Sequence, residues 1–326
     1  MTVHFWGVRG SIPTPASPSK IKSKISSIVE QITPEDLENA ESRERFLAGL
    51  PPWLFGTVGG NSPCISVTFD DSKSTPFPPD ECIVFDCGSG IRELGNAHAA
   101  LAAKAGEKRK YSYYHIFLSH FHWDHIQGLP FFVPGYNPAV KIDFYSPVAD
   151  LERVLSEQMI NPYFPVQINA LGSRKVFNYM EKNVEIHGRV ITMKKMNHPG
   201  GSYAYSINEN GKRFIYATDT ELTSADFIKN DENTAFFKDA DLIVIDSQYT
   251  LGEAIDKYNW GHSAFSLAVD FAANWDIKHM VMFHHDPSYD DHKLYGILQS
   301  ARWYLERMNI KGIELSLACE GLEISI

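Results

Sequence analysis

Four residues that can bind a metal ion lie within six consecutive positions of this chain. They are His120, His122, Asp124 and His125, in the sequence His-Phe-His-Trp-Asp-His. Imidazole and carboxylate groups are ligands of zinc and of its neighbouring transition metals. A chance cluster of this density is not expected from 13 histidines in 326 residues. Although a run of polar turn residues is the alternative, the spacing favours a metal site directly after the apolar strand predicted at residues 115–118.

Three further potential ligands follow predicted strands later in the chain. They are His198 after residues 189–196, Asp219 after residues 213–217 and His284 after residues 279–283. Any one of them alone would more often be a capping or loop residue. Because each stands where a strand ends, we expect their side chains to converge on one site. His285 is the alternative to His284, since the two residues are adjacent.

The length and composition indicate an ordinary globular protein. With 326 residues and 44% apolar content, residues 1–326 are expected to form one domain around a continuous core. The N-terminus has no signal-peptide pattern, and no apolar run approaches the roughly 20 residues of a membrane span, so we expect a cytoplasmic protein. Four cysteines without Cys-x-x-Cys spacing are expected to be reduced packing residues.

Short runs rich in Val, Ile, Phe and Tyr recur along the chain and predict β-strands. They lie at residues 2–8, 64–69, 82–86, 115–118, 141–145, 189–196, 203–207, 213–217, 242–246, 279–283 and 313–319. Helical patterns lie at residues 150–159, 263–274 and 292–308. Strands in both halves with helices between them indicate an α/β (α+β) fold, in which two stacked sheets are covered by helices.

A helical insertion is predicted at about residues 17–55. Apolar residues recur there at helical spacing, and Ser17-Pro18 offers an N-cap and a first-turn proline. A second helix is predicted to start at Thr33 and to end at Gly49. The hairpin could cover the active site as a lid or pack on the outside. The second interpretation is favoured, because insertions are generally tolerated at surfaces.

The motif at residues 120–125 resembles the His-x-His-x-Asp-His signature of the metallo-β-lactamase superfamily. Its continuation Gly128-Leu129-Pro130 resembles the branch that contains the tRNA 3′-processing endonucleases (RNase Z) and related cyclic phosphodiesterases. The similarity covers most of the chain and includes residues 7–14, 61–62, 85–90, 218–220 and 261–263. It implies an αββα four-layer sandwich, the metallo-β-lactamase fold, with metals at one edge between the sheets.

The same resemblance implies a ligand set for two divalent metal ions. His120, His122 and His198 would hold one ion, Asp124, His125 and His284 would hold the other, and Asp219 would bridge them. His284 is preferred to His285 by its spacing to Pro287. Zn²⁺ is the expected metal, and Mn²⁺ or Fe is compatible with nitrogen and oxygen ligands.

The implied chemistry is hydrolysis by a hydroxide that bridges the two metals. Asp124, beside both metals, would orient that hydroxide. His262 would stabilise the transition state or protonate the leaving oxygen, although a helix-capping or supporting role is the alternative. Asp246 and Asp86 could each orient a ligand histidine from behind.

The expected substrate is a small phosphodiester, such as a cyclic nucleotide or a cyclic sugar phosphate. The chain shows no glycine- and proline-rich arm of the kind that tRNA endonucleases use, and its net charge of −10 disfavours long nucleic acids. Aromatic residues at positions 131–164 could stack on a base, although core packing is the favoured interpretation.

Three other functions remain open at this point. The first is tRNA 3′-processing, the second is acyl hydrolysis by a lactonase or carboxylesterase, and the third is a non-catalytic metal-bearing sensor. A membrane partner is not expected. A homodimer is common in the resembling branch.

Overall fold

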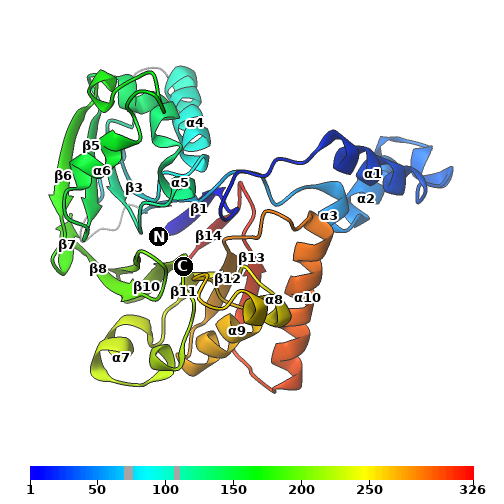
Figure 1. Ribbon diagram of the computed structural model, residues 1–326. Helices are drawn as coiled ribbons and strands as arrows, with labels where there is room; N and C mark the ends of the chain where they lie inside the picture. The colour runs from blue at the N-terminus through cyan, green and yellow to red at the C-terminus, as the bar shows by residue number, and fades with distance from the viewer. Residues whose placement is uncertain (70–75, 106–110) are drawn as a thin grey trace.

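The computed structural model describes residues 1–69, 76–105 and 111–326, whose strands form two stacked sheets (Figure 1). In spatial order the first sheet comprises β14 (Glu323–Ser325), β1 (Thr2–Gly7), β2 (Cys64–Thr68), β3 (Glu81–Phe85), β4 (Tyr113–Phe117), β5 (Lys141–Ser146) and β6 (Arg174–Tyr179). The second comprises β13 (Glu314–Leu317), β12 (His279–Phe283), β11 (Leu242–Asp246), β10 (Lys212–Ala217), β9 (Ser202–Glu209), β8 (Arg189–Met196) and β7 (Asn183–Ile186).

Helices lie on the outer side of each sheet (Figure 1). Beside the first sheet are α4 (Gly90–Ala105), α5 (Trp123–Ile126) and α6 (Leu151–Glu157), with the 3₁₀ turns η3 (Leu129–Phe131), η4 (Val133–Tyr136) and η5 (Ile168–Ala170). Beside the second are η6 (Ser224–Phe227), α7 (Asp231–Phe237), α8 (Leu251–Asp256), α9 (Phe265–Asn274) and α10 (Asp291–Arg307). The expected mixed α/β fold with two sheets and helices is confirmed.

An aromatic core fills the space between the two sheets. The ring of Phe85 in β3 lies 5.6 Å from Phe117 of its own sheet and 5.7 Å from Tyr205 of the other, measured between centroids. Alternate residues of a strand point to opposite faces. Tyr114 and Ile116 of β4 therefore pack beneath the outer helices instead. Burial of both faces of each sheet removes a large apolar area from water and holds the layers together.

The strands that carry the candidate ligands end at one edge of the sandwich. β10, β11 and β12 are parallel, and β8 runs in the same direction because both β8 and β10 are antiparallel to β9. The loops after these strands begin with residues 197, 218, 247 and 284. Residues 120–125 follow β4 in the first sheet. Parallel direction thus brings loops that are far apart in the sequence to the same edge.

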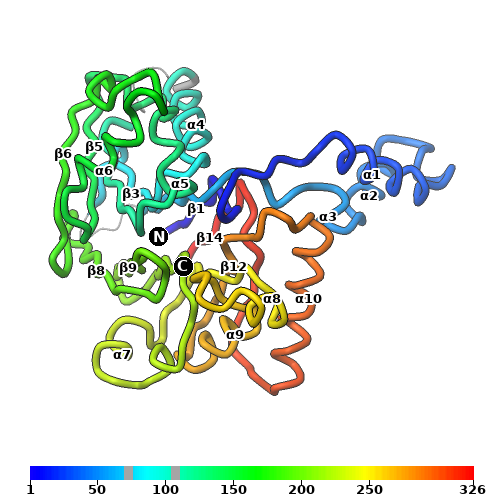
Figure 2. Tube along the Cα trace, viewed as in Figure 1, coloured from blue at the N-terminus to red at the C-terminus, as the bar shows by residue number. Residues whose placement is uncertain are grey.

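The segment between β1 and β2 projects from the body of the protein (Figures 1 and 2). It comprises α1 (Pro18–Val29), η1 (Glu35–Leu37), α2 (Ala40–Gly49) and α3 (Pro52–Phe55). Ser17 caps α1 as predicted, because its Oγ accepts from the backbone N–H of Lys20. Neither α1 nor α2 has a buried residue, and Lys24 ties α1 to Asp291 of α10 at 2.5 Å.

The prediction that the second helix of this segment starts at Thr33 is wrong. The backbone N–H and the hydroxyl of Thr33 both donate to Asp36, at 2.9 and 2.8 Å, which closes a single turn. The helix α2 starts after Asn39, which exchanges side-chain and backbone hydrogen bonds with Ser42. This capping box satisfies two backbone N–H groups at once and therefore determines where the helix begins.

Most predicted strands are present with shifts of one or two residues at their ends, and those at residues 189–196, 242–246 and 279–283 match fully. Strands β6, β7 and β14 and helices α4, α7 and α8 were not predicted. Cys64, Cys82, Cys87 and Cys319 are free thiols, as expected. In the described part of the chain, no helix has the length and apolar content to cross a membrane.

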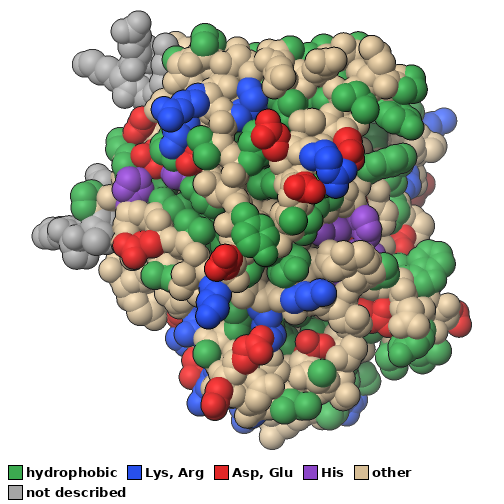
Figure 3. Space-filling model, turned by 60° about the vertical axis from the view of Figure 1, so that its left-hand side comes forward, with side chains coloured by type: hydrophobic (Ala, Val, Ile, Leu, Met, Phe, Trp, Pro, Cys, Tyr) green, Lys and Arg blue, Asp and Glu red, His purple; other side chains and the backbone are tan. Residues whose placement is uncertain are grey.

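The face of the molecule in Figure 3 has no large area of a single charge. Lysine and arginine side chains (blue) alternate with aspartate and glutamate (red) and with hydrophobic side chains (green). A broad basic surface for phosphate neutralisation is therefore not present on this face.

Candidate metal centre

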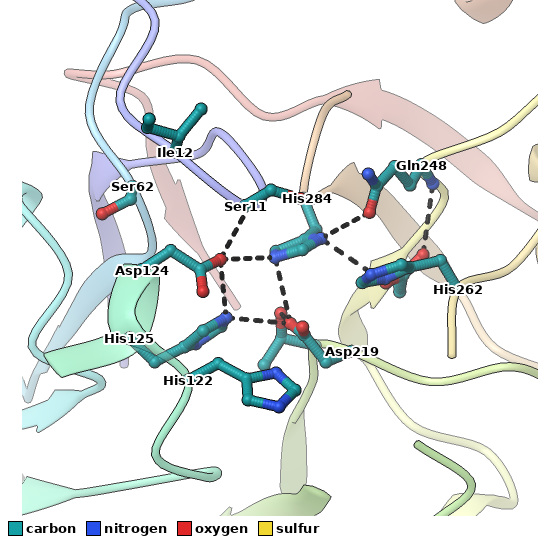
Figure 4. A network of polar contacts seen from close by, with 12 residues as sticks. Ser11, Ile12, Ser62, His122, Asp124, His125, Asp219, Gln248, His262 and His284 are labelled. Carbon is teal, nitrogen blue, oxygen red and sulfur yellow. Dashed lines mark hydrogen bonds and ion pairs between the residues drawn. The ribbon is translucent and has the colours of Figure 1, made fainter. Parts of the chain in front are cut away.

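Two groups of potential metal ligands meet at Asp219. Figure 4 shows Asp219 with His122 of one group and with Asp124, His125 and His284 of the other. One group is His120, His122, His198 and Asp219, and the other is Asp124, His125, His284 and Asp219. Within each group the candidate ligand atoms lie within 4.8 Å of one another. The structure thus brings together all seven residues that the sequence predicted as ligands, in the same two sets.

Asp219 presents a different carboxylate oxygen to each group. Its Oδ2 lies 3.6 Å from His120 Nε2 and 3.7 Å from His198 Nε2. Its Oδ1 lies 3.1 Å from His125 Nε2 and 3.1 Å from His284 Nε2. Asp124 Oδ2 completes the second group, at 3.2 Å from each of the same two nitrogens. This is the arrangement that a bridging carboxylate requires.

Two of the nitrogen atoms at the centre of the groups are buried without hydrogen bonds. His120 Nε2 and His125 Nε2 have no hydrogen-bond partner among the described residues. Ligands at about 2.0–2.1 Å from a tetrahedral zinc ion are about 3.4 Å apart, which falls within the 3.1–3.7 Å spacing of Asp219 and its four histidines. The residues present therefore fit two bound cations, because a cation would satisfy these buried nitrogens.

The outer nitrogens of the histidines are held by hydrogen bonds. His125 Nδ1 donates to Asp86 Oδ2 at 2.8 Å, and His198 Nδ1 donates to the carbonyl of Gly261 at 2.8 Å. His284 Nδ1 donates to Gln248 Oε1 at 3.0 Å. In each case the proton on Nδ1 leaves a lone pair on Nε2, which points into the cluster.

The electrostatics of the clusters also favour bound positive charge. Burial raises the pKa of Asp219, but His125, His284 and His120 outweigh it and hold that pKa well below its usual range. Burial lowers the pKa of His120 well below its usual value, assisted by His125. Burial lowers the pKa of His125, but Asp219, Asp124 and Asp86 outweigh it and raise that pKa well above its usual value. The carboxylates therefore favour positive charge at the second group.

Several of these residues have left-handed backbone conformations. The φ angles are 61° at Asp86, 46° at Asp219 and 61° at His284. Such conformations cost on the order of 1 kcal/mol for residues other than glycine and occur where the surrounding structure enforces them. At position 261, where φ is 88°, only glycine fits, because a Cβ there would lie 2.2 Å from His198 Nδ1.

His262 lies beside the second group and pairs with Asp246. His262 Nδ1 is 2.6 Å from Asp246 Oδ2, and its ring stacks on His284 with centroids 4.9 Å apart. Burial lowers the pKa of His262, but Asp246 outweighs it and raises the pKa to about 9. Asp246 lies farther from His284 Nδ1, at 3.6 Å. Asp246 therefore supports His262 more directly than it supports a candidate ligand.

A cavity of about 400 Å³ opens beside both groups. It is lined by Ser11, Phe121, His122, Trp123, Asp124, Asp219, His262 and His284. No residue of the projecting segment at about residues 17–55 is among these lining residues, so the cavity wall gives no support for a lid. The cavity is large enough for a small molecule and exposes both candidate catalytic residues, Asp124 and His262.

A family comparison agrees with this geometry. Residues 81–285 match the model of the β-lactamase superfamily domain. All seven candidate ligands lie within this range. The chain belongs to the β-lactamase superfamily. Membership of this superfamily and the two His/Asp groups together indicate that the protein is a metal-dependent hydrolase.

Individual relatives of this superfamily are distant. Ribonuclease Z of Acaryochloris marina (strain MBIC 11017) is 23% identical over 271 residues, which cover 67% of this chain and 80% of that protein. Zn(2+)-bound PqqB from Methylobacterium extorquens superposes with a TM-score of 0.64, 13% identity and full coverage of both chains. Human tRNase Z, short form, gives 0.60 and 18% identity, covering 100% of this chain and 99% of the other. These likenesses show the fold.

The structure also separates residues that the sequence left undecided. His285 Nε2 donates to the carbonyl of Ala318 at 2.8 Å, away from the clusters, whereas His284 lies in them.

Two contacts at the candidate site could not be predicted from the local sequence. Ser11 N–H donates to Asp124 Oδ2 at 2.8 Å, and Gln248 orients His284. Both join residues from loops that meet only in the folded chain.

Proposed function

We propose that this protein is a dinuclear metal-dependent phosphodiesterase that hydrolyses small phosphodiesters. The observation that carries the proposal is the division of Asp219 between two complete groups of ligands, with its two oxygens at 3.1 Å and 3.6–3.7 Å from their histidines. A single structural zinc site needs four ligands and no shared carboxylate. Two adjacent sites suit hydrolysis instead.

Two divalent cations, most simply Zn²⁺, would lower the pKa of a water molecule and neutralise charge on a phosphoryl oxygen. The protein would position the attacking water and the cations that bind the phosphodiester. Asp124 has one oxygen fixed by the backbone of Ser11, which leaves its other oxygen to orient the attacking water. His122 and Asp219 line the same cavity and, as proposed ligands, would hold the cations there.

His262 would supply the proton that the leaving oxygen needs. With a pKa of about 9, it is protonated at neutral pH. Asp246 occupies Nδ1, so Nε2 is the nitrogen that can donate to substrate in the cavity. General acid catalysis of this kind contributes on the order of 10²–10⁴-fold to a rate. This role distinguishes His262 from the candidate ligands.

The test compares two model substrates with and without a chelator. Bis-p-nitrophenyl phosphate should be hydrolysed by the metal-loaded protein, and the rate should fall to background after chelation and return when metal is added back. Hydrolysis of p-nitrophenyl acetate without hydrolysis of the diester would overturn the proposal in favour of an acyl hydrolase. The absence of turnover of either substrate, with metal bound, would favour a sensor.

A second candidate is tRNA 3′-processing, which the 23% identity to Ribonuclease Z favours. The net charge of −10 and the mixed charges on the visible face speak against a long polyanion. A precursor tRNA and a set of cyclic nucleotides and cyclic sugar phosphates should therefore be assayed side by side. Faster cleavage of the tRNA at equal enzyme concentration would reverse our preference.

A further inference from the structure

An apolar groove of about 540 Å³ adjoins the cavity of the candidate metal centre. We call it the aromatic groove and define it by Phe121, Trp123, Phe131, Tyr163, Phe164 and Gln158. Phe121 and Trp123 line both the groove and the metal cavity. They alternate with His120, His122 and Asp124 in the sequence. One short segment thus forms the metal site and the wall between the two spaces.

The groove exposes large aromatic side chains to water. Trp123 is 82% exposed, Tyr163 79% and Phe131 54%, whereas Asp124 and His125, the two candidate ligands that follow Trp123, are buried. The ring of Phe131 meets that of Phe164 edge-on at 5.8 Å. Figure 3 shows hydrophobic side chains (green) beside exposed histidines (purple) on the face that it presents. Grouped exposed aromatics of this kind mark ligand-binding surfaces more often than isolated ones.

The groove also contains an unused hydrogen-bonding group. The side-chain nitrogen of Gln158 is buried and has no hydrogen-bond partner among the described residues. Buried polar groups normally have partners, so a ligand that supplies one would gain a hydrogen bond. Gln127, which also lines the groove, donates its side-chain N–H to Ser62 Oγ at 3.0 Å.

The charge of the groove limits which ligand fits. Among its lining residues there is no lysine or arginine, and the single charged residue is Glu157, which is paired with Arg153 at 2.7 Å. A surface that follows a nucleic-acid backbone would carry cations. The groove therefore suits a neutral, planar group with hydrogen-bonding edges, and the phosphate belongs in the metal cavity.

We propose that the aromatic groove binds the nucleobase of a nucleotide substrate. The base would stack on Trp123 and Tyr163, and its edge would bond the amide of Gln158, while the phosphodiester lies at the metal centre. The inference rests on the proposed phosphodiesterase function and makes its substrate class more specific. It selects cyclic nucleotides over cyclic sugar phosphates that lack a base.

The kinetic test compares adenosine 2′,3′-cyclic phosphate with methyl riboside 2′,3′-cyclic phosphate, which has the same reacting group but no base. The metal-loaded wild type should prefer the nucleotide by about tenfold or more in kcat/KM. Tyr163→Ala and Gln158→Leu should each lower this preference by about fivefold or more, toward equal use of the two substrates and chiefly through KM, since stacking and base contacts act on binding. Trp123→Ala should have the largest effect.

The matched control is Trp303→Ala, which removes an exposed indole from α10 outside the groove and should leave the preference unchanged. Metal content is measured in every variant, because Trp123 adjoins two candidate ligands. Equal turnover of both substrates by the wild type would overturn the proposal. An unchanged preference in both Tyr163→Ala and Gln158→Leu would also overturn it.

A binding measurement separates this inference from the proposed function. Calorimetric titration of the metal-loaded protein should show tighter binding of adenosine 5′-monophosphate than of ribose 5-phosphate, and Tyr163→Ala should reduce the difference. If this result is obtained without turnover of any phosphodiester, the groove assignment stands and the proposed reaction fails. If phosphodiesters are hydrolysed and the two monophosphates bind equally, the reaction stands and the groove assignment fails.

Discussion

Among the described residues, two of the clusters of histidine and acidic side chains differ in their geometry. In the metal centre, Asp219 lies 3.1–3.7 Å from four histidine nitrogens, and two of these nitrogens have no hydrogen bond. In the second cluster, His115 Nε2 and His187 Nε2 lie 2.8 and 3.0 Å from the same oxygen of Glu81, at hydrogen-bonding distance. Both clusters offer ligand types that metals bind.

The difference shows that residue type does not define a metal site. In the second cluster each imidazole N–H has an acceptor, so no lone pair is left pointing to a common centre. In the candidate metal centre Nδ1 of His125 and of His198 makes a hydrogen bond, whereas the inner Nε2 atoms of His120 and His125 have none among the described residues. We therefore interpret the second cluster as a hydrogen-bonded contact between the sheets. Strand β3 serves both, with Glu81 at its start and Asp86 just after its end.

The largest expected effect is the loss of a proposed ligand. His122→Ala should reduce diester turnover by about 10³-fold or more and lower the bound metal, because one cation loses a ligand that faces the cavity. His187→Ala is the matched change in the second cluster and should keep the metal content. Elemental analysis and kinetics measure both. Equal metal loss in the two variants would remove the distinction between the clusters.

Removal of the proposed general acid should come next. His262→Ala should lower kcat by about 10²-fold while both metals stay bound, because His262 lines the cavity, pairs with Asp246 and is not one of the seven proposed ligands. A substrate with a p-nitrophenolate leaving group should be affected less than one with an alkoxide, since the former needs less protonation. Loss of metal in this variant would mean that His262 belongs to the ligand set.

A smaller effect is expected at a residue that only orients a ligand. Asp86→Asn should weaken metal binding by about 10- to 100-fold, because the ring of His125 loses its charged acceptor. Glu81→Gln provides the comparison, since it changes the acceptor of the second cluster in the same way. Competition with a chromophoric chelator measures the affinity. An unchanged affinity in Asp86→Asn would show that His125 is held without this bond.

The second cluster should matter for stability rather than for metal. His115→Ala should lower the free energy of unfolding by about 1–3 kcal/mol, because it leaves the buried oxygen of Glu81 with a weaker set of donors. Chemical denaturation of the metal-loaded protein gives this value, and the metal content should not change. A drop in metal content would instead assign this cluster a ligand role.

The smallest effect is the pH dependence of that stability. Burial lowers the pKa of His115, and the nearby Glu81 opposes this only in part. The unfolded chain therefore binds a proton at a higher pH than the folded one, so this residue reduces stability as the pH falls below about 6.5. The slope is less than about 1.4 kcal/mol per pH unit. Unfolding curves of His115→Gln should show a shallower dependence, and an equal slope would contradict this assignment.

The sequence predicted those features that depend on local patterns. The ligand motif is contiguous, and the remaining candidate ligands follow strands whose apolar runs are clear. Strands β7 and β14 are only four and three residues long, too short for a period-two pattern to be recognised. In α4, Gly90 and Gly95 lower the intrinsic helix propensity of the segment.

Features that depend on distant contacts could not be predicted. Ser11 and Asp124 are 113 residues apart in sequence, and the hydrogen bond between them exists only because the first sheet folds. The exposure of the aromatic residues could not be predicted from the sequence either. Phe132 is fully buried, as expected for core packing, whereas its neighbour Phe131 and the more distant Tyr163 are exposed in the groove. Exposure is a property of the packed layers, not of residue type.

The position of Asp86 has a consequence for motion at the metal edge. Its Oδ2 accepts hydrogen bonds from Ser119 and His125 of the first half of the chain and, at 2.8 Å, from Tyr216 of the second sheet. The two layers are thus joined at their polar edge, where sliding of one sheet over the other would break the bond from Tyr216 to a carboxylate that also orients Ser119 and His125. Motion between the sheets should be greatest at the opposite end, and amide hydrogen exchange should be slowest beside the candidate metal centre.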